Sequence, residues 1–180
     1  IFYLLLGAGI SKKTRGAALL LSTLILPIAL IVSLAPGNEN SPRLIHLDAG
    51  AGSAALLELP GSKRAFLIDA CGKTRTGSWR LARSLLDKGH RRIDGIILTH
   101  PHVDHAGALP VLTRSLDVGE VFCSEHFDRE KYGEKLLADA RKEGVIVSKV
   151  RRGQLLRLPG PEDIILRIIY PDQVENLPLA

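Results

Sequence analysis

The 180-residue sequence contains no methionine and only two cysteines, Cys71 and Cys123. Because translation starts at methionine and the chain opens with Ile1 inside an apolar run, we expect a piece of a longer protein, cut at both ends. Neither an internal repeat nor a low-complexity tract is present. Hydrophobic residues make up 46% and charged residues 24%, which is ordinary for a globular protein and excludes a wholly disordered chain.

Charge is absent from one long segment. Between Gly16 and Ala35 there is no charged side chain, and Leu, Ile, Val and Ala dominate. About 20 residues, at about 1.5 Å rise each, cross a hydrocarbon core of about 30 Å, so the segment predicts a transmembrane helix over 16–35. Pro27 near its middle is tolerated in a membrane helix, because neighbouring helices re-satisfy the freed carbonyl.

A cleavable signal peptide that begins at Ser11–Arg15 is the alternative interpretation. A second apolar stretch, Ile1–Ile10, precedes that charged start and is typical of the end of an earlier span. The small-residue site 33–35 is followed by Pro36, which is unfavourable directly after a cleavage point. Both features favour a membrane span over a signal peptide.

The basic residues of the short loop between the two apolar stretches, Lys12, Lys13 and Arg15, set the expected orientation. By the positive-inside rule this loop is cytoplasmic, and the chain after Pro36 then lies outside the cytoplasmic membrane. We therefore predict a membrane segment over 1–36 in contact with lipid, a linker over 37–42 and an extracytoplasmic domain over 43–180. The full-length protein is expected to span the membrane several times.

The two cysteines of that domain would face a compartment in which disulfides persist. Whether Cys71 and Cys123 pair stays open, since two buried free thiols fit the sequence equally well.

Positive charge is in small excess outside the membrane segment. The net charge is +5, of which the first 36 residues hold +3, so only +2 remains for the rest of the chain. This surplus is weak evidence for a nucleic-acid surface. The clusters Lys88-Arg91-Arg92 and Lys149-Arg151-Arg152 fit a solvated face better than phosphate contacts, although both interpretations are open.

Hydrophobic periodicity in the domain changes along the chain. Three short apolar runs, 43–48, 54–59 and 65–68, predict strands, and the turn residues Pro60–Lys63 predict an antiparallel meander. Helical and strand patterns then alternate, which predicts a mixed α/β layered domain. Helices are expected over 78–86, 106–116 and 129–142, and strands over 93–98, 118–123, 145–150, 154–158 and 163–170.

Apolar side chains in two of these helices recur at helical spacing. In 78–86 the pattern consists of Trp79, Leu81, Ala82, Leu85 and Leu86. In 129–142 the residues expected to face inward are Tyr132, Leu136, Leu137 and Ala140.

Metal-binding residue types gather directly after the buried strand 93–98. The motif is His100-x-His102-x-Asp104-His105, and α/β sheets place ligands at such strand ends. His100 and His102 are two apart, so in an extended segment they point the same way, whereas Asp104 and His105 come where a helix begins. The motif predicts two divalent metal ions, one held by the first two histidines and one by the Asp–His pair, with zinc favoured and manganese or iron also suited.

A histidine-rich surface loop is the alternative for this segment. Three of the six histidines of the chain fall within six residues, beside Pro101 and Gly107. This concentration at a strand end favours the metal site. Asp104 would then also orient an attacking water, which makes it the candidate catalytic residue.

The motif resembles the hallmark of the metallo-β-lactamase superfamily, and the resemblance runs from about Arg43 to the end of the chain. It implies an αββα sandwich in which the first two histidines bind one metal and the Asp–His pair binds the other. Leu67-Ile68-Asp69 is similar to the family's acidic strand end, which implies that Asp69 supports the metal loop from behind the ligands. The stretch 46–54, His-Leu-Asp-Ala-Gly-Ala-Gly-Ser-Ala, looks like the opening strand and turn of the outer domain of ComEC-type DNA-uptake channels.

The sequence departs from this family in one respect. The family's later ligands, a histidine and a bridging aspartate, have no counterpart before Ala180, and His126 is not at a position where the family has one. The resemblance therefore implies the N-terminal half of the sandwich, truncated at its C-terminus, with half of the site.

Three functions remain open at this point. The first is a metal-dependent hydrolase that cleaves phosphodiester bonds of DNA during DNA uptake. The second is another membrane-anchored metallo-hydrolase, of thioesters, β-lactams or phosphoesters. The third is a non-catalytic domain that guides DNA. None of these requires a small-molecule organic cofactor.

Overall fold

The computed structural model describes residues 41–48, 50, 52–158 and 164–169, together with Ile25. The chain divides into two units, Ile1–Asn38 and Glu39–Ala180, and the fold below is that of the second. The predicted membrane helix over 16–35 and the basic loop before it lie outside the described residues, except for Ile25. Among the described residues, no helix is both long and apolar enough to cross a bilayer.

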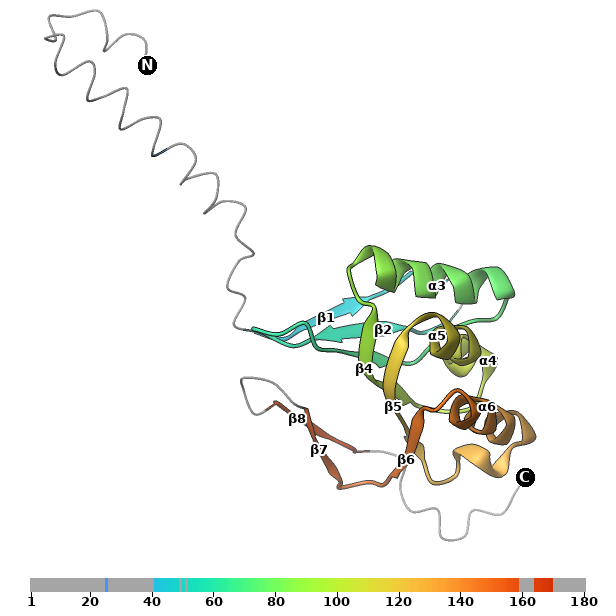
Figure 1. The fold of residues 1–180 in the computed structure, drawn as a ribbon. Coiled ribbons are helices and arrows are strands. Elements are labelled where there is room, and N and C mark those ends of the chain that lie inside the picture. The colour runs from blue at the N-terminus through green and yellow to red at the C-terminus, as the bar shows by residue number, and fades with distance from the viewer. Residues whose placement is uncertain (1–24, 26–40, 49, 51, 159–163, 170–180) are drawn as a thin grey trace, which may run out of the picture. The chain divides into compact units, whose positions relative to one another are not determined.

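A six-stranded mixed sheet organises the domain (Figure 1). Its strands follow chain order, β1-β2-β3-β4-β5-β6; the first two pairings are antiparallel and the other three are parallel. Strands β7 and β8 form a separate antiparallel hairpin. The strands are β1 Arg43–His46, β2 Ala55–Glu58, β3 Ala65–Ile68, β4 Arg92–Leu98, β5 Asp117–Ser124, β6 Ile146–Val150, β7 Leu155–Leu158 and β8 Ile164–Arg167.

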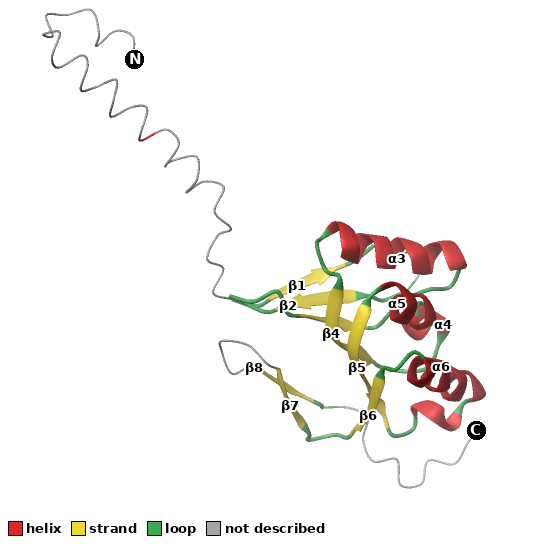
Figure 2. Cartoon of the chain, viewed as in Figure 1, coloured by secondary structure: helices red, strands yellow, loops and turns green. Residues whose placement is uncertain are grey.

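The helices lie together on one face of this sheet (Figure 2). They are α3 Arg75–Asp87, α4 Val103–Ala106, α5 Leu109–Ser115, the short 3₁₀ helix η1 Phe127–Arg129 and α6 Lys131–Lys142. The antiparallel meander and the later alternation of helices and strands are confirmed, and so is the mixed α/β class.

The helix predicted over 106–116 is confirmed for most of its length as α5, but it does not start at Ala106, where a separate short helix, α4, ends. The break has a hydrogen-bonding cause. The amide of Ala108 donates to the carbonyl of Ala70 at 2.8 Å, and the carbonyl of Asp104 accepts from Ser53 at 3.0 Å. In one continuous helix the amide of Ala108 would donate to the carbonyl of Asp104, but both groups bond to neighbouring loops instead. The next helix, α5, begins after this break, with Pro110 in its first turn.

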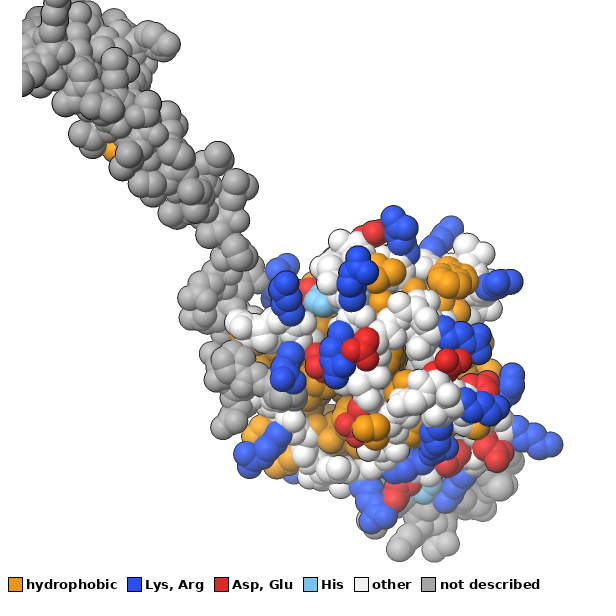
Figure 3. Space-filling view, in the orientation of Figure 1, with side chains coloured by type: hydrophobic (Ala, Val, Ile, Leu, Met, Phe, Trp, Pro, Cys, Tyr) orange, Lys and Arg blue, Asp and Glu red, His pale blue; other side chains and the backbone are white. Residues whose placement is uncertain are grey.

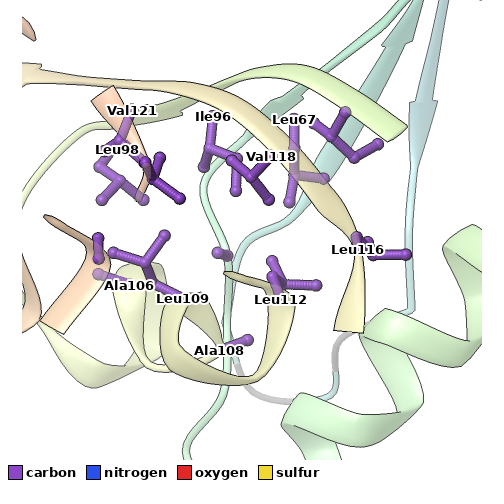
Figure 4. Close-up of a cluster of buried hydrophobic side chains, with 14 of the residues drawn as sticks. Leu67, Ile96, Leu98, Ala106, Ala108, Leu109, Leu112, Leu116, Val118 and Val121 are labelled. Atoms are coloured by element: carbon purple, nitrogen blue, oxygen red, sulfur yellow. The ribbon is translucent and has the colours of Figure 1, made fainter. Parts of the chain in front are cut away.

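A hydrophobic core fills the space between the sheet and the helices. Figure 4 shows side chains of β3, β4 and β5, among them Leu67, Ile96 and Val121, facing Leu109 and Leu112 of α5. All five are fully buried. At about 25 cal/mol per Å² of buried apolar surface, this layer is the main favourable contribution to folding.

The opposite face of the sheet is covered in part by the β7–β8 hairpin. Leu158 of the hairpin packs with Leu57 and Phe66 of the sheet in a second, smaller cluster. Gly95 of β4 lies beneath two aromatic rings, since a Cβ there would come within 2.8 Å of both Phe66 and Phe122. The hairpin is thus the beginning of a second β-layer, and no helix covers it among the described residues.

Two aromatic residues of the helical patterns are more exposed than expected. Leu136, Leu137 and Ala140 are buried as predicted, but Tyr132 is 38% exposed, so its inward assignment is wrong. It stands in the first turn of α6, at the edge of the contact with the core. On α3, Trp79 is 51% exposed although it shares the apolar spacing.

Replacing a buried leucine by alanine should destabilise the domain more than replacing an exposed leucine. We expect Leu109→Ala to lower the free energy of unfolding by about 2–5 kcal/mol, because a fully buried side chain leaves a cavity. Leu44→Ala is the matched control, since Leu44 is 55% exposed and the change should cost less than about 1 kcal/mol. Urea unfolding followed by circular dichroism measures both. Equal losses would contradict the described core.

Candidate metal centre

The histidine motif lies where two parallel strands end side by side. Strands β3 and β4 are paired in parallel, with Ile68 opposite Ile97. Asp69 directly follows β3, and its amide donates to the carbonyl of Ile97 at 2.9 Å. Thr99 directly follows β4, so the acidic strand end and the start of the motif meet at the same edge of the sheet.

Asp69 is a buried carboxylate with several donors around it. Its Oδ1 accepts the amide and the hydroxyl of Thr99, each at 2.9 Å, and its Oδ2 lies 2.7 Å from Nδ1 of His105. The residue is 3% exposed and has a φ of 59°, the left-handed region that aspartate tolerates better than most residues. Burial of an ionised carboxylate is costly unless it is hydrogen-bonded, so these contacts hold both Asp69 and its partners in place.

The same contacts orient two imidazole rings. Oγ1 of Thr99 lies 3.0 Å from Nδ1 of His100, and Asp69 binds Nδ1 of His105. Thr99 donates its one hydroxyl proton to Asp69, so it can only accept from His100. All contacts are satisfied when both rings carry their proton on Nδ1. This arrangement leaves the Nε2 atom of each ring available, and Nε2 of a neutral imidazole is a usual metal-binding atom.

Three side chains of the motif converge. His100, Asp104 and His105 each offer a ligand atom, and these atoms lie within 4.8 Å of one another. The ring centroids of His100 and His105 are 4.0 Å apart. The exposed ring of His102 lies edge-on to that of His100 at 4.7 Å, but it is outside the group of three. The division into a His100–His102 pair and an Asp104–His105 pair stays a prediction.

The charge states of these groups suit a divalent cation. Partial burial, and then the neighbouring His105 and His102, lower the pKa of His100, which favours its neutral form. A hydrogen bond to its own backbone and then Lys73 lower the pKa of Asp104, which favours the carboxylate. Two imidazole nitrogens and one carboxylate oxygen fit zinc well and manganese acceptably.

The backbone of the motif rests on the turn that follows β1. The amide of Ser53 donates to the carbonyl of Asp104 at 3.0 Å, and the amide of Ala70 donates to that of His105 at 2.6 Å. A Cβ on Gly52 would come within 2.4 Å of the carbonyl of Asp104 and 2.1 Å of Sγ of Cys71. Only glycine allows this close approach at 52, and Gly50 has a φ of 70°, a conformation that glycine adopts without strain.

Sequence reasoning assigned no role to Thr99 or Lys73. Thr99 stands between the strand and the motif, where a hydroxyl reaches both Asp69 and His100, and this position is its only sequence signal. Lys73 follows the strand end after Asp69, and its Nζ lies 3.9 Å from Oδ2 of Asp104. The pairing of β3 with β4 brings Thr99 within reach of Asp69 and places Lys73 beside the motif.

The remaining candidate residues lie apart from this group. His126 precedes η1 and is not among the clustered metal donors of the described residues. Cys71 and Cys123 are both buried, and neither belongs to a disulfide in the described part of the chain. Burial raises the pKa of Cys123 to about 11, so its thiol stays protonated and unreactive near neutral pH.

Comparison with known proteins identifies the class. The model of the metallo-β-lactamase superfamily matches residues 47–177, and the chain belongs to this superfamily. It is also similar to ComE operon protein 3 of Bacillus subtilis (strain 168), with 25% identity over 183 residues that cover 94% of this chain. The match covers 23% of that protein, so the chain spans about a quarter of its length. The predicted relationship to ComEC-type proteins is thereby confirmed.

Solved structures of the same superfamily are similar over part of the chain. MEM-A1, a subclass B3 metallo-β-lactamase from a soil metagenome library, is 21% identical with a TM-score of 0.47; the match covers 68% of this chain and 47% of that one. A metallo-β-lactamase mutant from Cronobacter sakazakii is 21% identical with a TM-score of 0.46; the match covers 65% and 47%.

Substitution of Thr99 tests whether this hydroxyl orients the site. We expect Thr99→Val to weaken binding of Zn²⁺ about 10- to 100-fold, because the donor to Asp69 and the acceptor for His100 are both lost. Thr99→Ser keeps the hydroxyl and should bind nearly as the unchanged protein does. Competition with a chromophoric chelator measures the Kd. Tight binding by Thr99→Val would contradict this role.

Proposed function

We propose that this domain is a metal-dependent hydrolase that cleaves phosphodiester bonds of DNA in the course of DNA uptake. The observation that supports the proposal most directly is the group His100, Asp104 and His105, held from behind by the buried Asp69. The similarity to ComE operon protein 3 supports the connection with competence. His102, whose ring lies beside that of His100, is proposed as a further ligand.

Each residue of the site has a proposed task. Divalent metal ions supply Lewis acidity and lower the pKa of water, which makes a nucleophile available near neutral pH. His100 and His105 offer Nε2 to the metal because their Nδ1 atoms are occupied by Thr99 and Asp69. Asp104 is ionised, so it can bind the metal and orient the attacking water.

Lys73 gives the site a fixed positive charge. Its Nζ is 3.9 Å from Asp104, and its side chain is 50% exposed, so it can also contact an incoming anion. A phosphodiester carries one negative charge, and a lysine ammonium is a usual partner for phosphate oxygens. This charge favours phosphodiesters over uncharged thioesters as substrates.

We also propose that the domain is extracytoplasmic and follows membrane spans in the full-length protein. The uncharged segment 16–35 and the basic loop before it support this orientation.

Removal of one ligand tests the hydrolase proposal. In the full-length protein, His105→Ala should lose bound metal and lower hydrolysis of bis(p-nitrophenyl) phosphate and of oligothymidylate at least 100-fold, since a site that loses one of its few ligands rarely holds zinc tightly. His126→Ala is the matched control and should change neither. Elemental analysis and initial rates measure the two effects.

The outcomes separate the alternatives. Hydrolysis of a β-lactam or thioester, but of no phosphodiester, would replace the proposal by another metallo-hydrolase. Metal binding without hydrolysis of any of these substrates would indicate a non-catalytic domain. Stoichiometric metal retained by His105→Ala would end the ligand assignment.

Topology has a separate test. Alkaline phosphatase fused after Ser53 should be active, because this enzyme acquires its disulfides only outside the cytoplasm. Green fluorescent protein fused to the same residue through the same secretion route should stay dark. An inactive alkaline phosphatase fusion together with a fluorescent green fluorescent protein fusion would refute the orientation.

A further inference from the structure

The only tryptophan of the chain lies half exposed on the surface of α3. Trp79 is 51% exposed, while the opposite side of the same helix buries Leu81 and Leu85 completely. The side of the helix that packs on the sheet is thus formed by Leu81 and Leu85, and about half of the Trp79 side chain faces solvent. Tryptophan offers a large flat π-surface on which another aromatic group can stack.

Positive charge surrounds this ring. A shallow groove along α3 is lined by Trp79 together with Arg80, Arg83 and Lys88, and its only acidic residue is Asp87. Asp87 is paired with Arg83 at 2.9 Å, and no ion pair of Arg80 or Lys88 occurs among the described residues. Figure 3 shows Lys and Arg side chains gathered over the part of the surface that α3 occupies, with hydrophobic atoms between them.

A second hollow lies between this groove and Lys73. It is lined by Lys73, Thr74, Gly77, Asp48 and, in common with the first groove, by Thr76 and Arg80. Lys73 in turn lies 3.9 Å from Asp104 of the candidate metal centre. The two hollows share Thr76 and Arg80, so Arg80 and Lys73 form a path of cationic side chains from Trp79 toward Asp104, with Asp48 as the one acidic residue in the lining of the second hollow.

The chemistry of this path specifies its occupant. We propose that the groove along α3 binds single-stranded DNA, with a base stacked on Trp79 and the backbone led past Arg80 and Lys73 to the metal centre. The proposal rests on the hydrolase function given above and deepens it by naming the form of the substrate. Phosphates recur along a strand and match the row of cations, and every unpaired base has a face that stacks on an aromatic ring.

A DNA duplex and a protein partner both fit this surface less well than a single strand. A duplex keeps its base faces covered by neighbouring pairs, so it could use the cations but not Trp79. A protein partner would gain from Trp79 but would have to cover Arg80 and Lys88, which form no ion pair in the described part of the chain, with acidic residues of its own. Single-stranded DNA satisfies the ring and the cations together.

Because the 180-residue chain has one tryptophan, its tryptophan emission reports on the surroundings of Trp79. With metal removed by chelation, so that no strand is cleaved, titration with a 20-nucleotide oligothymidylate should quench the emission of Trp79. Binding should weaken with salt, since phosphates release counterions when cations neutralise them. A 20-base-pair duplex at the same salt should bind at least about tenfold more weakly and should not quench.

Variants measured by anisotropy of a labelled strand complete the test. Trp79→Ala should raise the Kd about tenfold or more. The double variant Arg80→Ala/Lys88→Ala should raise the Kd and lower the slope of log Kd against log salt by about 1.4, the value for two lost phosphate contacts on a single strand. The matched control is Lys131→Ala/Lys135→Ala, which removes two exposed cations of α6 and should leave the Kd within about twofold.

The proposal is overturned if Trp79→Ala binds as tightly as the unchanged chain, if the duplex binds equally well, or if the α6 control loses as much affinity as the α3 variant. Self-association in sedimentation that Trp79→Ala abolishes would show that another copy of the chain covers the ring instead. Since binding is measured without metal, His105→Ala should bind the strand normally even where it hydrolyses nothing. Failure of this inference is therefore distinguishable from failure of the hydrolase proposal.

Discussion

The buried carboxylate of Asp69 is the contact on which the candidate site depends. It lies between two strand ends and accepts from Thr99 and His105 at 2.7–2.9 Å. Through Thr99 it also influences the ring of His100. A carboxylate with these donors is stable at 3% exposure, whereas the same group without them would be strongly unfavourable. The partners it orients are the same two rings whose Nε2 atoms are left for a metal, so stability and metal binding depend on one network.

Backbone contacts extend this dependence to the rest of the domain. The motif hydrogen-bonds to the turn after β1 through Ser53 and to the segment after β3 through Ala70. These contacts use the carbonyls of Asp104 and His105, and they end α4 after a single turn. The interruption of the helix is therefore a consequence of how the site is held, and the core beneath it, formed by α5 and the sheet, supplies the rigid base that a preorganised site needs.

Helix α3 connects the site with a larger surface. Its inner side, with Leu81 and Leu85, anchors the helix on the sheet, and its outer side presents Trp79 and a row of cations. Its first turn lines the hollow that reaches Lys73 near the metal ligands. The net charge of the domain is only slightly positive, because acidic residues elsewhere offset the basic residues of α3. The net charge therefore does not indicate this arrangement. Local distribution, more than net charge, determines which partner such a surface attracts.

The sequence by itself determined the meander, the alternation of helices and strands and the family, and it located the candidate metal motif, because these follow from periodicity and from residues adjacent in the chain. It also singled out Asp69, since an acidic residue at a strand end belongs to the family pattern. Only the tertiary structure decided that Thr99 and Lys73 join the site, that His100 groups with Asp104 and His105, and that Trp79 faces outward. Those facts arise from the parallel pairing of β3 with β4 and from the side on which α3 packs, which are contacts between residues far apart in the sequence and leave no local pattern.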